Sequence, residues 1–157
     1  MAEEKTNVMR ILDKAKISYK HYTYEGDGTT TGTEVAKKLN QDPRQVFKTL
    51  VTIGKSKSYY VFVVPVEKEL NLKLAAISVG EKSIEMIKSK ELLSVTGYIH
   101  GGCSPIGMKK RYKITIDTQA EEFDTIIFSA GKIGSQVQLS LEDLRKVVDF
   151  QTALIAE

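Results

Sequence analysis

Residues 47–66 read FKTLVTIGKSKSYYVFVVPV, and this stretch decides the fold class of the chain. Its two halves, residues 47–53 and 59–66, are rich in the β-branched and aromatic residues that favour strands. The short segment between them contains Gly54 and predicts a hairpin. The second half is apolar enough for a central strand, and Pro65 marks its end. We therefore expect a sheet built around this hairpin.

Helix signals lie on both sides of the hairpin. Apolar residues at helical spacing predict a first helix over residues 5–16 and a last helix over 141–148. Capping and stop residues predict three short helices between them. The expected boundary residues are Thr31 with Glu34 for the first of these, Asn71 and Gly80 for the second, Ser89 and Gly97 for the third, and Ser140 for the last helix.

Strands outnumber helices, and short turns join many of them. Besides the hairpin, strands are expected at residues 19–24, 98–100, 112–116, 125–129 and 136–139. A doubly wound parallel sheet, which alternates strands with helices, fits this pattern poorly. We expect an α+β fold, with a single domain over residues 1–157 in which helices surround a mixed, barrel-like β-sheet.

The composition excludes several classes of protein. A formal net charge of +3 is too small for a histone-like binder, so nucleic acid would need a local patch. One cysteine excludes an internal disulfide, and with two histidines it leaves too few ligands for structural zinc, so we expect no metal and no cofactor. No stretch approaches the ~20 apolar residues that span a bilayer, and the first 16 residues lack a signal core. We expect a cytoplasmic protein with no membrane partner.

A glycine-rich loop at residues 96–111, TGYIHGGCSPIGMKKR, carries the strongest chemical signal. Gly101 and Gly102 lack a Cβ, so their N–H groups can approach a ligand oxygen closely, and Pro105 stiffens the loop. The three cations at 109–111 could hold a polyanion beside such a ligand. A plain turn before a solvated charge run explains the same residues. The loop alone leaves both interpretations open.

Lys48 is a cation inside a predicted strand. Period-two alternation places Phe47, Thr49 and Val51 on one face and Lys48 with Leu50 on the other. The ammonium then either reaches a sheet edge with its stem along apolar surface or points into a cleft. The strand pattern alone favours the first of these interpretations, a lysine that reaches the sheet edge.

Five motifs, in order, resemble the YbaK/EbsC family of aminoacyl-tRNA deacylases. They are Phe47-Lys48-Thr49-Leu50, Thr96-Gly97-Tyr98, Gly101-Gly102-Cys103-Ser104-Pro105-Ile106-Gly107, Lys109-Lys110-Arg111 and Ser129-Ala130-Gly131-Lys132. The likeness covers nearly the whole chain and implies the family fold, one α+β domain around a mixed, barrel-like sheet. The branch that the chain resembles most clears cysteine from tRNA(Pro). Sister branches remove alanine or form the editing insertion of prolyl-tRNA synthetase.

The resemblance also implies a catalytic site. It places the family's functional lysine at Lys48 and its Gly-x-x-x-Pro loop at Gly101 to Pro105. Cleavage of the aminoacyl ester builds negative charge on the carbonyl oxygen, which the amides of Gly101 and Gly102 would stabilise. The Lys48 ammonium would hold the terminal ribose or phosphate. The residues expected to bind substrate in the same pocket are Tyr24, Tyr98, Ser104, Pro105, Ser129 and Gly131.

The matching motifs contain no obvious protein nucleophile. For the cysteine-clearing branch the resemblance implies attack by the substrate's own thiol, which leaves as a cyclic thiolactone, a route closed to alanine and proline. Cys103 lies three residues after His100 and invites a cysteine-hydrolase interpretation, but the glycines between them give no assurance that the side chains meet. We expect no catalytic role for Cys103, and we interpret His21 as a half-buried strand residue.

Basic residues give the expected contacts to tRNA. We interpret Lys109, Lys110, Arg111 and Lys132 as contacts to the tRNA backbone, which position a substrate without reading its sequence. So few cations predict modest, salt-dependent affinity, and we expect a transient complex with prolyl-tRNA synthetase to supply selectivity for tRNA(Pro). Two alternatives share the same cleft: a deacylase for Ala-tRNA(Pro) or another small amino acid, and a non-catalytic module that binds tRNA ends.

Two positions depart from the family pattern. Gln136 stands where relatives often have an acidic residue, so no carboxylate role is transferred to it. Thr31 stands where some relatives have an aromatic side chain, so the expected pocket wall is more open there. Both departures leave the amino-acid selectivity open.

Overall fold

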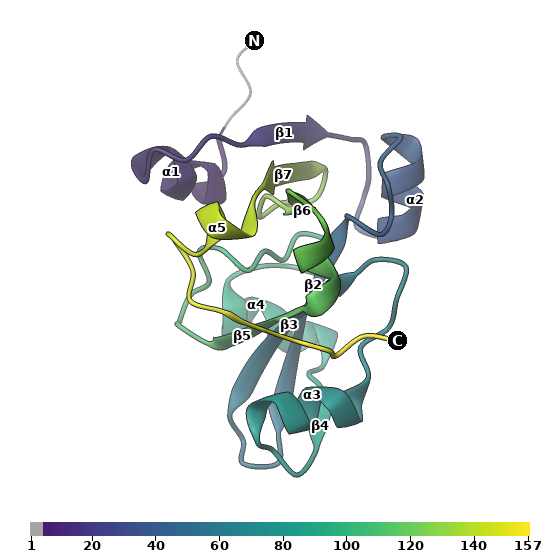
Figure 1. The fold of residues 1–157 in the computed structure, drawn as a ribbon, viewed down its shortest axis with the longest axis vertical. Coiled ribbons are helices and arrows are strands. Elements are labelled where there is room, and N and C mark those ends of the chain that lie inside the picture. Colours follow the sequence, from purple (N-terminus) through teal and green to yellow (C-terminus); the bar gives the residue numbers. More distant parts are fainter. Residues whose placement is uncertain (1–4) are drawn as a thin grey trace.

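The computed structural model describes residues 5–157, which form two β-sheets with short helices around them (Figure 1). A mixed five-stranded sheet has the order β4-β2-β3-β5-β8, and an antiparallel three-stranded sheet has the order β1-β7-β6. The strands are β1 (Lys20–Thr23), β2 (Phe47–Gly54), β3 (Tyr59–Pro65), β4 (Ile84–Met86), β5 (Lys113–Asp117), β6 (Ile126–Ser129), β7 (Ser135–Leu139) and β8 (Gln151–Ala153). The helices are α1 (Asn7–Lys14), α2 (Gly32–Lys38), α3 (Leu72–Val79), α4 (Leu92–Thr96) and α5 (Leu141–Leu144), with 3-10 turns η1 (Ser89–Glu91) and η2 (Thr118–Glu122).

The predicted hairpin forms the centre of the larger sheet. β2 and β3 pair antiparallel, from Phe47 opposite Pro65 to Ile53 opposite Tyr59, and β3 pairs parallel with β5. On its other side β2 pairs with β4 at residues 52–54. Within the described chain no strand pairs with that side of β2 beside residues 47–50. This open strand edge positions the candidate site.

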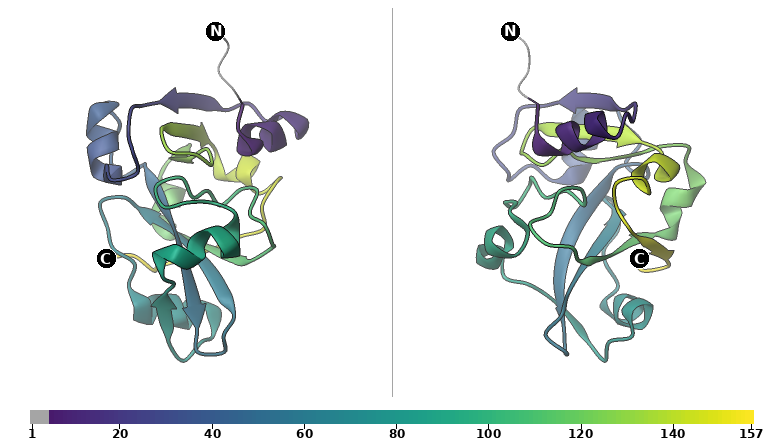
Figure 2. Two further views of the ribbon diagram at one scale, coloured as in Figure 1. Left: turned by 180° about the vertical axis from the view of Figure 1, so that it is seen from behind. Right: turned by 90° about the vertical axis from the view of Figure 1, so that its left-hand side faces the viewer.

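The two faces of the hairpin pack into different cores. Phe47, Val51 and Val63 face the space between the sheets, where the largest buried cluster lies. Phe62 and Val64 face the other way and pack with the buried alanines of α3. Figure 2 (right) accordingly shows α4 and α3 on opposite sides of the hairpin. The predicted alternation is confirmed, and removal of these apolar side chains from water is the main stabilising term.

Local capping residues set several helix ends as predicted. The side chains of Thr31, Asn71 and Ser140 begin α2, α3 and α5 by accepting a hydrogen bond from the amide three residues later, at 3.2, 2.9 and 3.1 Å. Gly80 and Gly97 end α3 and α4 with φ of +73° and +85°. Glycine adopts these left-handed angles without the Cβ clash that other residues meet.

Several local predictions are wrong. Residues 98–100 form no strand, because the Tyr98 hydroxyl donates to the Ile106 carbonyl and holds this segment across the loop. η1 begins after Lys88 without a side-chain hydrogen bond, so Ser89 is not its cap. α5 ends at Leu144, four residues early, because the chain turns back there and the Arg145 guanidinium stacks over a downstream ring. β4 and β8, three residues each, are too short to give a sequence pattern.

The α+β class with a mixed sheet is confirmed, but the sheets do not form a closed barrel. The two sheets meet at a parallel bridge between Val46 and Ile127. Within residues 5–157, β4 and β8 remain the edges of the larger sheet. Because β4 pairs only with residues 52–54 of β2, the edge of β2 beside residues 47–50 stays open.

Candidate functional site

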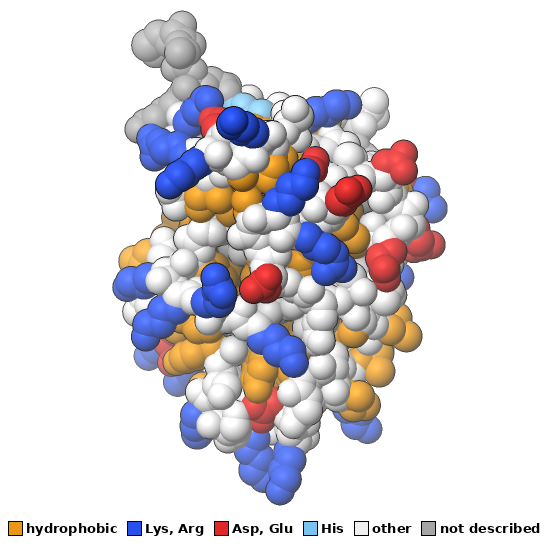
Figure 3. All heavy atoms as spheres, turned by 60° about the vertical axis from the view of Figure 1, so that its left-hand side comes forward, with side chains coloured by type: hydrophobic (Ala, Val, Ile, Leu, Met, Phe, Trp, Pro, Cys, Tyr) orange, Lys and Arg blue, Asp and Glu red, His pale blue; other side chains and the backbone are white. Residues whose placement is uncertain are grey.

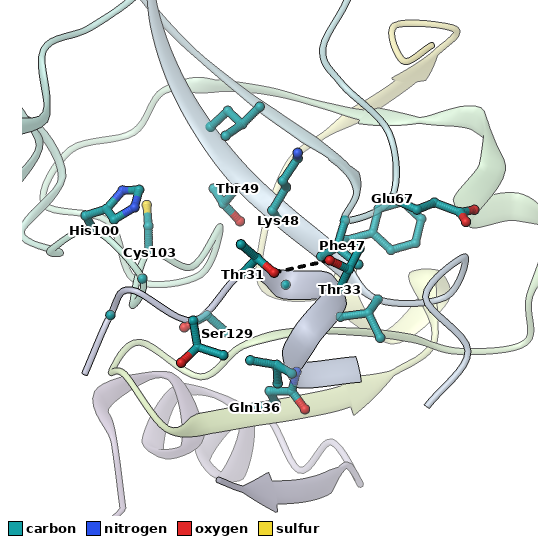
Figure 4. A pocket seen from close by; sticks show the side chains of 18 of the residues that line it. Thr31, Thr33, Phe47, Lys48, Thr49, Glu67, His100, Cys103, Ser129 and Gln136 are labelled. Atoms are coloured by element: carbon teal, nitrogen blue, oxygen red, sulfur yellow. Dashed lines mark hydrogen bonds between the residues drawn. The ribbon is translucent and has the colours of Figure 1, made fainter. Parts of the chain in front are cut away.

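A cavity of about 530 Å³ lies at the open edge of β2 (Figure 4). Residues 46–50 form one wall, and residues 28–33, which lead into α2, contribute another part of the lining. Glu67 and Glu69 follow β3, while His100, Gly101 and Cys103 come from the glycine-rich loop. Four of the predicted site residues share this cavity: Tyr24, Lys48, Gly101 and Ser129.

Lys48 reaches the cavity from the strand edge. Its side chain is 29% exposed, and its Nζ lies 3.6 Å from Oε1 of Glu69, whose side chain is 83% exposed. The backbone of Glu69 exchanges two hydrogen bonds of 2.9 Å with Glu157, which fixes the segment that carries the carboxylate. An ion pair this solvated is weak, so an incoming anion can take the place of Glu69. Of the two interpretations of Lys48, the structure favours the cation in a cleft.

Thr49 adds polar groups that the sequence analysis missed. Its hydroxyl is buried and has no hydrogen-bond partner in the described chain. The Val66 amide donates to the Val46 carbonyl, so these two residues form a hydrogen-bonded pair of the antiparallel ladder. Hydrogen-bonded and non-hydrogen-bonded pairs alternate along such a ladder, which makes Thr49 and Val63 a non-hydrogen-bonded pair. The N–H and C=O of Thr49 therefore point away from β3. They face the open edge. The strand therefore presents a donor, an acceptor and a hydroxyl beside Lys48.

The two glycines of the loop have different roles. Gly101 lines the cavity with φ of +86°, and within residues 5–157 its amide donates no hydrogen bond to another group. Gly102 is buried, and its amide donates to the Ile99 carbonyl at 3.0 Å. A Cβ on Gly102 would lie 3.0 Å from the Ile133 nitrogen, so this glycine serves close backbone packing. The geometry does not support Gly102 as an oxyanion donor, because its N–H is already used.

Three further predicted residues support the loop and do not line the cavity. Tyr98 donates to the Ile106 carbonyl, and burial raises the pKa of Tyr98 to about 12, so it remains a donor at neutral pH. Gly131, with φ of +97°, packs against the Tyr98 ring. Ser104 is buried and accepts from the Ile106 amide at 3.3 Å. Tyr98, Gly131 and Ser104 were expected to contact substrate, but in the structure they hold the loop in place.

The part of the cavity opposite Lys48 is polar and uncharged (Figure 4). Ser129 Oγ accepts from the Gly131 amide at 3.1 Å, so its own proton can be donated elsewhere. Gln136 Oε1 accepts from Gln41 Nε2 at 2.8 Å, which leaves the Gln136 amide N–H groups for the cavity. The departure at Gln136 therefore replaces a charge with a neutral amide, and Thr31 serves as the cap of α2 at the cavity wall.

Cys103 lines the cavity but is poorly suited to nucleophilic attack. Burial raises the pKa of its thiol to about 12, so the thiol is protonated at neutral pH, and the thiolate is the reactive form. None of the lining serine, threonine and cysteine side chains is hydrogen-bonded to His100, the histidine of this cavity. A nucleophile–base pair is thus missing from the described cavity wall.

Cys103→Ala is expected to leave kcat for ester cleavage within about threefold of wild type, because the thiol supplies no nucleophile. With a pKa near 12, Cys103 also contributes no rise in rate between pH 6 and 9. The measurement is a pH–rate profile of both proteins, with melting temperatures recorded to separate packing from chemistry. Loss of all activity in a folded variant would contradict the assignment.

The predicted tRNA-binding cations do not line the first cavity. Lys109, Lys110 and Arg111 are exposed and line a second cavity of about 300 Å³, to which Pro105 also belongs. Lys132 is exposed, and its backbone packs against Gly102. The loop of residues 101–111 thus separates the two cavities.

The described residues contain neither a cluster of possible metal ligands nor a helix that could cross a membrane. Between residues 5 and 157, no group of three or more His, Cys, Asp or Glu side chains is placed to hold a metal ion. In the same range no helix has the length and apolar character needed to cross a bilayer.

Comparison with known proteins relates this geometry to a family. A family model described as "Aminoacyl-tRNA editing domain" matches residues 27–147, which include every residue of the cavity wall except Tyr24. The chain belongs to the aminoacyl-tRNA editing family. The predicted resemblance is confirmed, and with it the assignment as an aminoacyl-tRNA deacylase.

Three known proteins illustrate what this chain is similar to. The "Putative Cys-tRNA(Pro)/Cys-tRNA(Cys) deacylase EbsC" of Enterococcus faecalis is 40% identical over 154 residues, 98% of this chain and 94% of the relative. A proline–tRNA ligase of Thermosipho africanus is 31% identical over 80 residues, 51% of this chain and 14% of the ligase. A solved structure described as "a putative trans-editing enzyme for prolyl tRNA synthetase" shares the fold, with a TM-score of 0.83, 21% identity and coverage of 98% and 99% of the two chains.

Proposed function

We propose that this deacylase is a free-standing trans-editing enzyme that clears cysteine from mischarged tRNA(Pro). The observation that carries the proposal is the shared cavity of Lys48 and Gly101, which is lined by a partly exposed cation and by an amide that has no hydrogen-bond partner in the described chain. The relative named for Cys-tRNA(Pro) supports the substrate class.

Lys48 binds and orients the substrate in this proposal. A phosphate or ribose oxygen of the tRNA end displaces Glu69 from the ammonium, which then fixes the ester beside the loop. The N–H and C=O of Thr49 lie next to this position and can hold the α-amino and carbonyl groups of the aminoacyl moiety. Binding at several points leaves the ester in one orientation.

The loop stabilises the developing charge. The amide of Gly101 is free, and the amide of Cys103, two residues on, also donates no hydrogen bond within the described chain. Two such donors aimed at one oxygen form an oxyanion hole, and loss of one donor in other enzymes costs about 3 kcal/mol. Cys103 and Gly101 replace the pair expected from the sequence, since the Gly102 amide is occupied.

The substrate supplies the nucleophile. The sulfur of the bound cysteine attacks its own ester carbonyl, a C–S bond forms, and the C–O bond to the ribose breaks. The thiol proton goes to the released ribose hydroxyl through water, and the product is a cyclic thiolactone. The protein then contributes orientation and charge stabilisation, which is consistent with a cavity wall without a nucleophile–base pair.

Selectivity for tRNA(Pro) comes from a partner in this proposal. The cavity of Lys48 contacts only the tRNA end, which is common to all tRNAs, and a transient complex with prolyl-tRNA synthetase would supply the identity. The similarity of half of this chain to a segment of a proline–tRNA ligase supports a link to that enzyme class. Equal rates on every Cys-tRNA, unchanged by added synthetase, would refute the partnership.

A deacylation panel tests the proposed substrate. Purified protein is offered tRNA(Pro) charged with cysteine, alanine, serine or proline, and release of the amino acid is timed. Cysteine is expected to be cleared at least about 100-fold faster than the others, because the others have no thiol to attack the ester. Equal clearance of Ala-tRNA(Pro) would assign the protein to small amino acids in general. Tight binding without turnover of any ester would indicate a tRNA-end-binding module.

A further inference from the structure

The second cavity lies on the other side of the glycine-rich loop. It opens between Ile11 of α1, the loop from Pro105 to Tyr112 and the turn at residues 147–149. Cys103 lines the first cavity and Pro105 lines the second, so only the width of this loop separates them. Two residues of extended chain span at most about 7 Å. The linings of the two cavities therefore come close to each other at this point of the loop.

The lining of the second cavity combines apolar walls with a positive rim. Ile11, Met108 and Val148 are partly buried and pack against the main core, and they leave apolar surface on the cavity wall. Lys109 and Lys110 are exposed at the rim. Figure 3 shows a face of the molecule on which Lys and Arg side chains surround uncovered hydrophobic surface. This combination suits a flat apolar group with an attached anion.

The charges of the two cavities differ. Lys48 of the first cavity is accompanied by the carboxylates of Glu67 and Glu69. The second is lined by three cations and one carboxylate, Asp149, which lies 3.7 Å from Arg111. Both members of that pair are about 90% exposed, at 90% and 88%, so the pair is screened and does not neutralise the rim. Charge complementarity therefore favours a polyanion in the second cavity.

We propose that the second cavity binds an unpaired nucleotide of the tRNA acceptor end. Its base lies on the apolar walls, and the adjoining phosphates lie at Lys109, Lys110 and Arg111. The proposal rests on the proposed function, because that function places the terminal nucleotide of the same strand in the first cavity. A nucleobase has an apolar face and a linked phosphate, and stacking with backbone contacts is the usual way to bind single strands without reading sequence.

Two variants separate the parts of this subsite. Lys110→Ala removes a phosphate contact, while Val148→Gln replaces an apolar part of the wall with a polar side chain without changing the charge. The matched control is Lys57→Ala, which removes an exposed cation from the β2–β3 turn. The full chain is used throughout, and circular dichroism and melting temperatures verify folding.

Binding is measured first, with a fluorescent single-stranded RNA tetranucleotide titrated over a range of salt. Lys110→Ala should weaken binding and reduce the slope of log K against log salt by about 0.7. Val148→Gln should weaken binding about fivefold or more with the slope unchanged, because apolar contact with the base is lost and no phosphate contact is. Equal losses in Lys57→Ala, or unchanged binding in both test variants, would overturn the proposal.

Kinetics then links the subsite to the reaction. Both test variants should raise KM for Cys-tRNA(Pro) about fivefold or more with kcat unchanged, and should leave cleavage of cysteine methyl ester unaffected. A parallel loss on the small ester would show that the variants act through the first cavity and would contradict the proposal. If the wild type cleaves no Cys ester yet binds the tetranucleotide with the expected variant effects, the proposed function fails and the subsite stands.

Discussion

Lys48→Ala is expected to lower kcat/KM for Cys-tRNA(Pro) by at least about 100-fold. The variant removes the only Lys or Arg side chain that lines the first cavity within the described residues. Without it the tRNA end has no ammonium to bind in place of Glu69, and misplacement of the ester by about 1 Å can cost a factor of about 100. Single-turnover deacylation measures the effect directly.

Two controls sharpen this experiment. Lys57→Ala removes an exposed cation at the far turn of the same hairpin and should change the rate less than about twofold. Lys48→Arg keeps the charge but changes its geometry, so partial activity is expected. Full activity in folded Lys48→Ala would remove the lysine from the mechanism.

Gly101→Ala should lower kcat by about 100-fold, with a smaller change in KM. Gly101 has φ of +86°, and a Cβ there would lie 3.0 Å from the Cα of Gly28, a neighbouring residue of the cavity lining. The backbone must therefore shift, and the shift moves the amide that we assign to the oxyanion. An oxyanion donor acts in the transition state, so its loss appears in kcat.

Gly80→Ala is the matched control for backbone strain. Gly80 also has a positive φ, +73°, but a Cβ there would meet no atom within 4 Å. The substitution should lower the free energy of unfolding by about 1 kcal/mol and leave the rate unchanged. If Gly80→Ala and Gly101→Ala lose activity equally, strain alone explains the result and the oxyanion assignment is wrong.

The central elements of the fold could be predicted because their signals are local. The two halves of the hairpin at residues 47–66 are rich in strand-forming residues, and Asn71 and Gly80 bound α3 with side-chain and backbone preferences that act within one turn. β4 could not be predicted, because a three-residue strand exists through its pairing with β2 and not through its own propensity. Its short length is what leaves the edge of β2 open.

The family resemblance led us to expect two of the cavity residues in one site. Neither the strand around Lys48 nor the loop around Gly101 decided this by its own pattern, and the structure places both residues at one cavity. Thr49 was hidden, because alternation assigns its side chain to the face of Phe47 and gives no sign that the strand edge is open. Gly102 looked identical to Gly101 in sequence, and the structure distinguishes it by its burial and by the hydrogen bond from its amide to the Ile99 carbonyl.

The source of the nucleophile is tested most directly by blocking the substrate's sulfur. Cys-tRNA(Pro) and the same tRNA carrying S-methylcysteine are incubated with purified protein. The amount of intact aminoacyl-tRNA is followed by acid precipitation, and the released product is identified by mass spectrometry. We expect clearance of the free-thiol substrate with a thiolactone as the first product, and clearance of the methylated substrate at least about 100-fold slower. Equal rates on the two substrates would show that water or a protein group attacks the ester, and that the cavity of Lys48 and Gly101 works by a different chemistry.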